Sequence, residues 1–123
     1  MTSAFQLIPN SQQRRTHPLL YRQSQDLKTA MIEGAGLHIE LITRPGENFK
    51  PVDRSPPPTH LSQLGWKALV LHTADLKAVT SVLRLHDVEI CWAEQQLSEH
   101  LQSTLIRDPE GNLINILGPF VAA

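Results

Sequence analysis

The chain has few of the features that direct a protein outside the cytoplasm. Only one of its 123 residues is a cysteine, Cys91, so an intrachain disulfide is excluded and a reducing compartment is expected. No apolar run approaches the roughly 20 residues that a membrane-spanning helix needs. The N-terminus also lacks the apolar core of a signal peptide. The sequence therefore predicts a cytoplasmic protein without a membrane partner.

An excess of charge of one sign is also lacking. The formal net charge is −1, and Arg14-Arg15 is the only basic doublet. A nucleic-acid-binding surface needs clustered Lys and Arg, so no nucleic-acid partner is expected. The remaining composition, 41% hydrophobic and 19% charged residues, is typical of a globular protein with a real core.

Prolines divide the chain into two halves. Most of them lie in residues 45–64, which include Pro56-Pro57-Pro58. Such a run enters neither a helix nor a central strand and acts as a semi-rigid spacer. We therefore predict a single domain over residues 1–123, in which a Pro-rich connector, residues 45–64, joins residues 1–44 to residues 65–118. The alternative for the connector is a solvated loop with no ligand role.

The second half has a regular order of elements. Residues 66–73 alternate as a strand, with Ala68, Val70 and His72 on one face. Asp75 is a plausible N-cap, because a carboxylate accepts hydrogen bonds from the first helical N–H groups. A helix is predicted after it, then a strand over residues 88–92 and a polar loop or helical turn over 93–102. The helix is indicated by apolar residues at helical spacing: Leu76, Val79, Val82 and Leu83.

The sequence Asp-Pro-Glu-Gly-Asn, from Asp108 to Asn112, predicts a tight turn. Pro109 presets its own φ, Gly111 supplies a positive φ, and the flanking Asp and Asn bond to nearby backbone. Apolar, strand-like residues precede and follow this turn. They predict a β-hairpin that completes the order β-α-β-β-β.

The first half has a weaker pattern. Short strands are predicted over residues 4–8, 19–21 and 28–33, and a clearer one over residues 37–43. Alternation in this last strand places His38 and Glu40 on the same face. Two polar residues on one face indicate either contact with water or a site.

Taken together, these motifs resemble the vicinal oxygen chelate superfamily, which includes glyoxalase I, extradiol dioxygenases and bleomycin-resistance proteins. The resemblance covers roughly residues 27–118 and is strongest from Gly65 onwards, where it rests on the order of the motifs and not on the Asp-Pro-Glu-Gly-Asn turn alone. It implies an α+β fold of paired βαβββ modules around a shared cavity. The first module is expected to be truncated, because residues 1–44 have too few strand and helix signals for a complete one.

The resemblance also implies a position for each of four metal ligands. The family holds a divalent metal, which acts as a Lewis acid, with His or Gln, Glu, His and Glu. Glu40 matches the Glu ligand of the first module. Gln6 is the best available match for the His or Gln ligand that comes before it. The two positions of the second module are Ala68, which has no donor atom, and Asn115, which is a weak neutral ligand. We therefore expect no cofactor, and the remaining possibility is a divalent metal with relocated ligands such as His38 and His72.

Five residues are candidates for contact with a ligand: His38, Glu40, His72, Asn115 and Trp66. Asn115 offers both a donor and an acceptor, and Trp66 could form an aromatic wall. For each of them the alternative is a structural or solvent-exposed role, which is common for lone strand histidines and carboxylates. His17, His60, His86 and His100 have no ligand spacing, and we predict that they lie on the surface.

Three functions are compatible with these residues. The first is a small-molecule-binding protein that works without the metal. The second is a metal-dependent lyase, dioxygenase or thiol transferase with rearranged ligands, so whether the protein is an enzyme stays open. The third is a dimeric scaffold without catalysis. A truncated first module leaves a sheet edge to cover, so we also predict a homodimer, in which the two chains could exchange modules.

Overall fold

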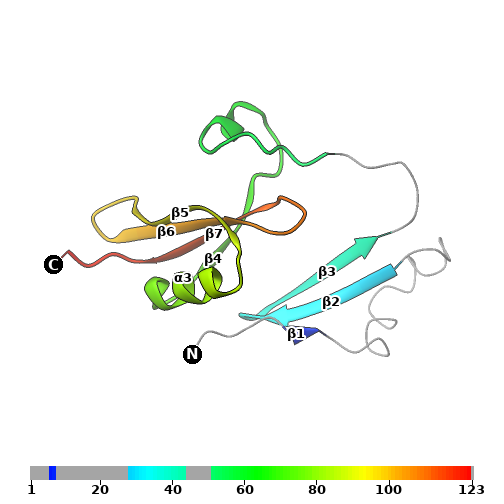
Figure 1. Ribbon diagram of the computed structural model, residues 1–123, viewed down its shortest axis with the longest axis horizontal. Helices are drawn as coiled ribbons and strands as arrows, with labels where there is room; N and C mark the ends of the chain where they lie inside the picture. Colours follow the sequence, from blue (N-terminus) through cyan, green and yellow to red (C-terminus); the bar gives the residue numbers. More distant parts are fainter. Residues whose placement is uncertain (1–5, 8–27, 44–50, 123) are drawn as a thin grey trace. The chain divides into compact units, whose positions relative to one another are not determined.

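The computed structural model describes residues 6–7, 28–43 and 51–122 (Figure 1). They belong to two compact units, one on each side of the Lys50–Pro51 junction. Each unit is described by itself. The predicted strand over residues 19–21, and most of that over 4–8, lie outside the described residues.

The first unit is a three-stranded antiparallel sheet with the order β1-β2-β3. Its strands are β1 (Gln6–Leu7), β2 (Lys28–Gly34) and β3 (Leu37–Thr43). A two-residue turn, Ala35-Gly36, joins β2 to β3. Both turn residues have a positive φ, 51° and 75°, which is the geometry that matches the right-handed twist of a hairpin.

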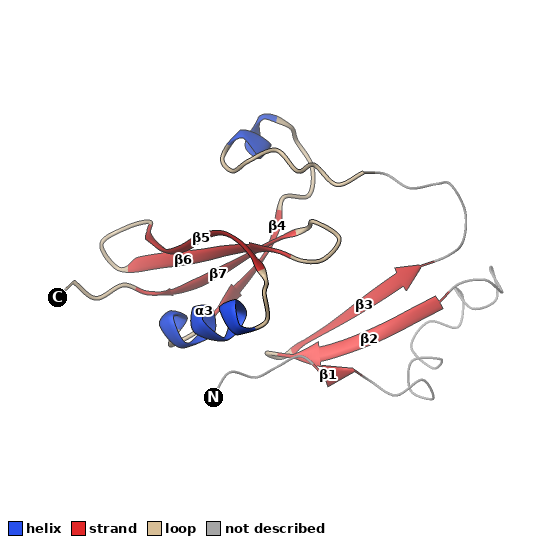
Figure 2. Ribbon diagram, in the orientation of Figure 1, coloured by secondary structure: helices blue, strands red, loops and turns tan. Residues whose placement is uncertain are grey.

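The second unit has the βαβββ order that the sequence predicts (Figure 2). Its sheet has the strand order β4-β7-β6-β5, in which β4 runs parallel to β7 and the other neighbours are antiparallel. The elements are η1 (Thr59–Ser62), β4 (Ala68–His72), α3 (Leu76–Leu85), β5 (Glu89–Gln96), β6 (Leu101–Arg107) and β7 (Leu113–Pro119).

Helix α3 begins where the sequence predicts and covers one face of this sheet. The Asp75 carboxylate accepts a hydrogen bond from the Ala78 N–H at 3.0 Å, so Asp75 is the N-cap. Leu76 is 2% exposed and packs with two isoleucines of the sheet, Ile106 and Ile116. Burial of these apolar side chains holds the helix on the sheet.

The Asp-Pro-Glu-Gly-Asn sequence forms the predicted turn between β6 and β7. The Asp108 N–H donates to the Asn112 carbonyl at 2.9 Å, and the Asp108 carboxylate accepts from the Asn112 N–H at 2.8 Å. Gly111 has a φ of 95°, a conformation that glycine adopts without strain.

The region predicted as a polar loop or helical turn, residues 93–102, is a loop only over residues 97–100, so the predicted bounds were wrong. Strand β5 continues to Gln96 and β6 begins at Leu101. The register between these strands shifts twice, between Ile90 and Trp92 and again before Gln95. Each shift breaks the two-residue alternation by which a strand is recognised in a sequence.

The first unit departs from the complete module of the second. In the second unit the opening strand, β4, pairs in parallel with the last strand, β7, whereas in the first β1 pairs antiparallel with its neighbour β2. Within residues 6–7 and 28–43 there are three strands and no helix. This arrangement agrees with a truncated first module.

Candidate functional site

The candidate site lies on the face of the second-unit sheet that is opposite α3. Ile114 and Ile116 pack toward the helix, so Asn115 between them points to the other face. The strand register extends this face to the neighbouring strands, because directly paired residues share a face. Its members on β4, β7 and β6 are Ala68, Val70, His72, Leu113, Asn115, Leu117, Ser103, Leu105 and Arg107.

Asn115 is the end of a chain of side-chain hydrogen bonds on this face. The indole Nε1 of Trp92 donates to the Ser103 hydroxyl at 2.8 Å, and this hydroxyl donates to Asn115 Oδ1 at 2.6 Å. The directions are fixed because an indole N–H can only donate, which leaves the serine proton for the amide oxygen. Asn115 therefore has its oxygen engaged and offers its NH₂ group, for which no partner is found among the described residues.

The β4 side of this face is open to solvent. Val70 pairs with Asn115 in the register and is 48% exposed. His72 is two residues further along β4 and is also exposed. Trp66 lies before the strand, which begins at Ala68, and is 77% exposed. Three of the predicted residues, Trp66, His72 and Asn115, are thus in this unit, and the last two share one face.

The donor set of this face does not fit the divalent metal that the resemblance implies. Ala68 contributes only a methyl group. The atom of Asn115 that is suited to a metal is Oδ1, and this oxygen already accepts a hydrogen bond from the Ser103 hydroxyl. Within residues 6–7, 28–43 and 51–122, no three His, Cys, Asp or Glu side chains are grouped so that they could hold a metal ion.

The other predicted residues belong to the first unit. His38 and Glu40 share a face of β3, and the Nε2 atom of His38 lies 3.4 Å from the Glu33 carboxylate, with both side chains more than half exposed. Glu40 is partly buried. Gln6 is on β1 and pairs with Glu33 of β2, so the strand that carries this suggested ligand is not next to β3.

The part of the connector within the described residues is anchored to the second unit by Arg107, a contact that the sequence did not indicate. Arg107 is 4% exposed. Its Nη2 atom donates to the Ser55 carbonyl at 3.1 Å, and its Nη1 atom donates to the Gly111 carbonyl at 2.7 Å. A buried guanidinium that binds two carbonyls holds residues 53–55 against the hairpin.

The connector also carries a buried histidine. We predicted His60 on the surface, and this prediction was wrong: His60 lies in the short helix η1 and is 8% exposed. Its carbonyl accepts a hydrogen bond from Lys67 Nζ at 2.8 Å, which closes the connector onto the start of β4. A contact between segments of irregular backbone leaves no periodic signal in the sequence.

The turn at the start of this connector segment contains an ionised carboxylate. Hydrogen bonds from the Ser55 side chain and backbone N–H hold the pKa of Asp53 below its ordinary value, and the charge of Lys67 adds to this effect. Because the pKa is lowered in the folded state, the contribution of Asp53 to stability is present at neutral pH. It is lost as the pH falls through the lowered pKa.

Similarity to known proteins is found at the level of structure. Neither a protein-family model nor a curated protein sequence matches this chain. A glyoxalase family protein from Bacillus cereus superposes with a TM-score of 0.61 at 17% identity, covering 98% of this chain and 80% of that one. The chain has the glyoxalase fold. A Bacillus anthracis protein that is also named for the glyoxalase family superposes with a TM-score of 0.57 at 12% identity, covering 94% and 74%.

The superposition on glyoxalase family structures confirms the predicted fold class, α+β with βαβββ modules. The second unit has the element order of one such module. The fold does not assign an activity, because one fold carries many functions. No helix within the described residues is both long and apolar enough to cross a membrane.

Proposed function

We propose that this protein binds a small molecule against the sheet face opposite α3, without the divalent metal of the vicinal oxygen chelate proteins. The observation that carries the proposal is the Trp92–Ser103–Asn115 chain of hydrogen bonds. It turns the amide at the former ligand position into a fixed hydrogen-bond donor. A donor held through a buried hydroxyl and a partly buried indole is preorganised, which is what a specific polar contact in a binding cleft requires.

The surroundings of Asn115 define the kind of ligand that would fit. The amide NH₂ group suits a carbonyl, carboxylate or ether oxygen. Val70, which is 48% exposed beside it, offers apolar surface, and His72 offers an imidazole. The exposed ring of Trp66 suits a flat or aromatic part of the ligand. His38 and Glu40 on β3 of the first unit stay candidates for polar contact with a ligand.

The experiment that tests this proposal is a thermal-shift screen of small molecules that join an apolar ring to an oxygen acceptor. Compounds that raise the melting temperature of the wild type should lose most of this effect on Asn115→Leu. They should keep it on Gln96→Leu, a change of the same kind at an exposed position of β5. If the active compounds stabilise both variants equally, they do not bind at Asn115 and the proposal fails.

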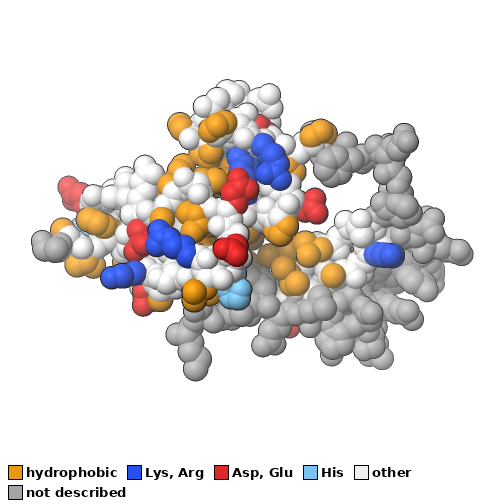
Figure 3. Space-filling view, viewed as in Figure 1, with side chains coloured by type: hydrophobic (Ala, Val, Ile, Leu, Met, Phe, Trp, Pro, Cys, Tyr) orange, Lys and Arg blue, Asp and Glu red, His pale blue; other side chains and the backbone are white. Residues whose placement is uncertain are grey.

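We also propose that the protein is a homodimer, in agreement with the edge left by the truncated first module. Strand β3 is one of the two outer strands of the described first-unit sheet. Leu41 and Ile42 on this strand are 52% and 50% exposed, and hydrophobic side chains gather over the hairpin β2–β3 on the face drawn in Figure 3. Exposed apolar residues on an unpaired strand favour association. We also propose a cytoplasmic location, for which the single cysteine is the support.

A further inference from the structure

Strand β5 contains a β-bulge that decides on which face of the sheet Trp92 lies. Ile90 pairs with Ile106 of β6 and packs against the apolar core between α3 and the sheet. Trp92 is two positions further along β5 but pairs with Leu105, only one position from Ile106. In a regular strand Trp92 would share the face of Ile90. The extra residue, Cys91, moves it to the opposite face, on which Leu105 lies.

A second bulge follows on the same strand. Between Trp92 and Gln95, β5 again has one residue more than β6. Glu94 has a φ of 48°, which is uncommon for a residue other than glycine, and its N–H donates to the Thr104 hydroxyl at 3.0 Å. Bulges are frequent at sheet edges, where they prevent pairing, and beside active sites, where they re-aim a side chain. Because β5 is an edge strand, the side chain that is re-aimed decides between these two roles.

The re-aimed side chain is an indole that lies along the sheet. Trp92 Nε1 donates to the Ser103 hydroxyl at 2.8 Å, and Ser103 is two positions from Leu105, the direct partner of Trp92. The ring therefore extends over the neighbouring strand. Ser103 is 0% exposed and Leu105 is 3% exposed, as expected for residues that a ring covers. Trp92 itself is only partly buried, so part of the indole surface is open to a ligand.

The indole and the free amide group of Asn115 lie in the same part of the face. Asn115 and Trp92 both pair with Leu105, one from each side. The Ser103 hydroxyl that accepts from the indole also donates to Asn115 Oδ1 at 2.6 Å, which holds the amide near the ring. A flat ligand that rests on the indole can therefore direct an oxygen toward the amide NH₂ group.

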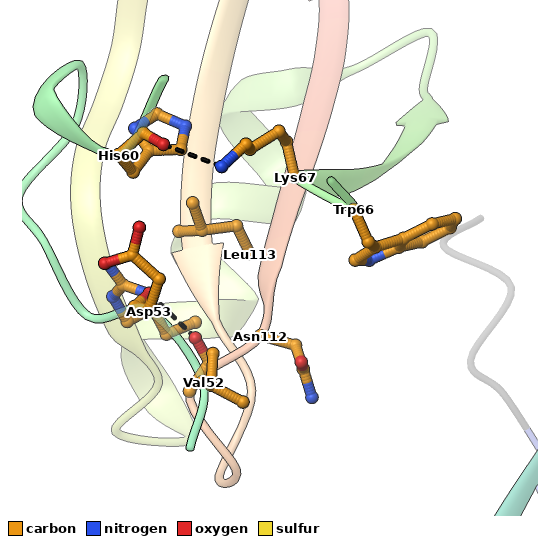
Figure 4. A pocket seen from close by; sticks show the side chains of 9 residues that line it. Val52, Asp53, His60, Trp66, Lys67, Asn112 and Leu113 are labelled. Carbon is orange, nitrogen blue, oxygen red and sulfur yellow. Dashed lines mark hydrogen bonds between the residues drawn. The ribbon is translucent and has the colours of Figure 1, made fainter. Parts of the chain in front are cut away.

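Trp66, the other of the two tryptophans, does not rest on this face. It precedes β4 and is 77% exposed. In Figure 4 its ring points away from Leu113, a member of the face on β7. The aromatic ring that lies on the sheet beside Asn115 is therefore that of Trp92.

The electronic character of this surface restricts the ring that it binds. The face of an indole is negative because of its π electrons and attracts electron-poor and cationic rings. The row of paired residues that contains Trp92 and the next row toward Gln95 hold no Lys or Arg that would repel such a ring. In the row on the other side, Arg107 lies 3.9 Å from the Glu89 carboxylate, so their charges oppose each other. These two rows consist of Val70, Asn115, Leu105 and Trp92, and of His72, Leu117, Ser103 and Gln95.

We propose that the ligand contains an electron-poor aromatic ring with a carbonyl substituent. The ring stacks on the indole of Trp92, and the carbonyl oxygen accepts a hydrogen bond from Asn115 Nδ2. This inference rests on the proposed function, because it uses the same face and the same amide, and it adds the class of the ligand. It also gives the bulge at Cys91 a role, since a regular strand would place the indole on the face of α3.

The test is an NMR titration of the ¹⁵N-labelled protein with three carboxamides that carry different rings. They are 1-methylnicotinamide, with a cationic aromatic ring, benzamide, with a neutral aromatic ring, and cyclohexanecarboxamide, with no π electrons. The indole N–H signal of Trp92 should shift saturably. 1-Methylnicotinamide should bind at least threefold more tightly than benzamide and at least tenfold more tightly than cyclohexanecarboxamide. Equal affinities, or saturable binding that leaves the Trp92 signal in place, would overturn the proposal.

Trp92→Leu separates contact with the ligand from the structural role of the indole, which also binds Ser103. A purely structural role would weaken the binding of all three compounds by the same factor. Loss of the stacking surface should instead remove the preference among them. A preference that survives in Trp92→Leu and disappears in Trp66→Leu would assign the ring contact to Trp66 and overturn the proposal.

Asn115→Leu distinguishes failure of this inference from failure of the proposed function. If binding is lost in Asn115→Leu but the wild type shows no preference among the rings, the ligand class is wrong and the proposed site stands. If the compounds bind Asn115→Leu as tightly as the wild type, both fail. If none of the three binds the wild type, the ligand class is wrong, and the thermal-shift screen still decides the proposed function.

Discussion

At the scale of single residues, the polar part of the candidate site depends on Ser103. Its side chain is fully buried, and one hydroxyl group both accepts from Trp92 and donates to Asn115. A hydroxyl can do both, whereas the methyl group of an alanine can do neither. The geometry of Asn115 is therefore set by a residue that a ligand on this face would not need to touch.

Substitution of Ser103 by Ala should lower the free energy of unfolding by about 1–3 kcal/mol, because the partly buried indole N–H and amide oxygen both lose their partner. Urea unfolding measures this loss. Ser81→Ala is the matched control: its hydroxyl donates to the Lys77 carbonyl on the exposed side of α3, and its removal should change stability by less than about 0.5 kcal/mol. Equal effects of the two substitutions would show that the hydrogen-bond chain is not formed.

Some of these residue-level features could be predicted from the sequence and others could not. Asp75 and the turn at Asp108 were predicted correctly because each bonds to backbone within four residues. Ser103 was missed because its partners are on other strands, and its contact with Trp92 follows a shift of register. The contact between Arg107 and Ser55 joins residues 52 positions apart, which no local pattern encodes.

At the scale of elements, the connector segment within the second unit is part of the folded structure. Arg107 binds carbonyls of the connector and of the hairpin, and Lys67 binds the carbonyl of His60. The proline run, which indicated a spacer, thus continues into a segment that closes one end of the sheet. The sequence predicted a connector here, but it gave no sign of these contacts with the second unit.

Replacement of Arg107 by Lys tests this attachment. Lysine keeps the charge but cannot reach both carbonyls with a planar fork, so we expect a loss of about 2–4 kcal/mol, given that bonds from charged donors contribute about 1.5–3 kcal/mol each. Protease cleavage within residues 51–62 should also become faster. Arg84→Lys on the surface of α3 should change neither quantity, and an Arg107→Lys variant that resists protease as well as the wild type would contradict the account.

At the scale of the whole molecule, the truncated first module makes association the expected state. Light scattering after size-exclusion chromatography should give a mass twice that of one chain. Leu41→Glu should shift the protein toward monomer, because it places a charge among the exposed apolar residues of β3. Leu85→Glu, the same change at a leucine of α3 that is 82% exposed, should leave the dimer intact. A wild type that is monomeric over the whole concentration range would contradict the homodimer.

We propose that this protein, which has the glyoxalase fold, works without a divalent metal, because the resemblance places Ala68 and Asn115 at two of the metal-ligand positions. The most direct test is elemental analysis after loading with Mn, Fe, Co, Ni or Zn and desalting, with the Ala68→His/Asn115→Glu variant loaded in parallel. We expect the wild type to retain far less than one equivalent of any metal and the variant to retain more. One tightly held equivalent in the wild type, lost on Glu40→Ala, would contradict this proposal and indicate a metal-dependent enzyme with relocated ligands.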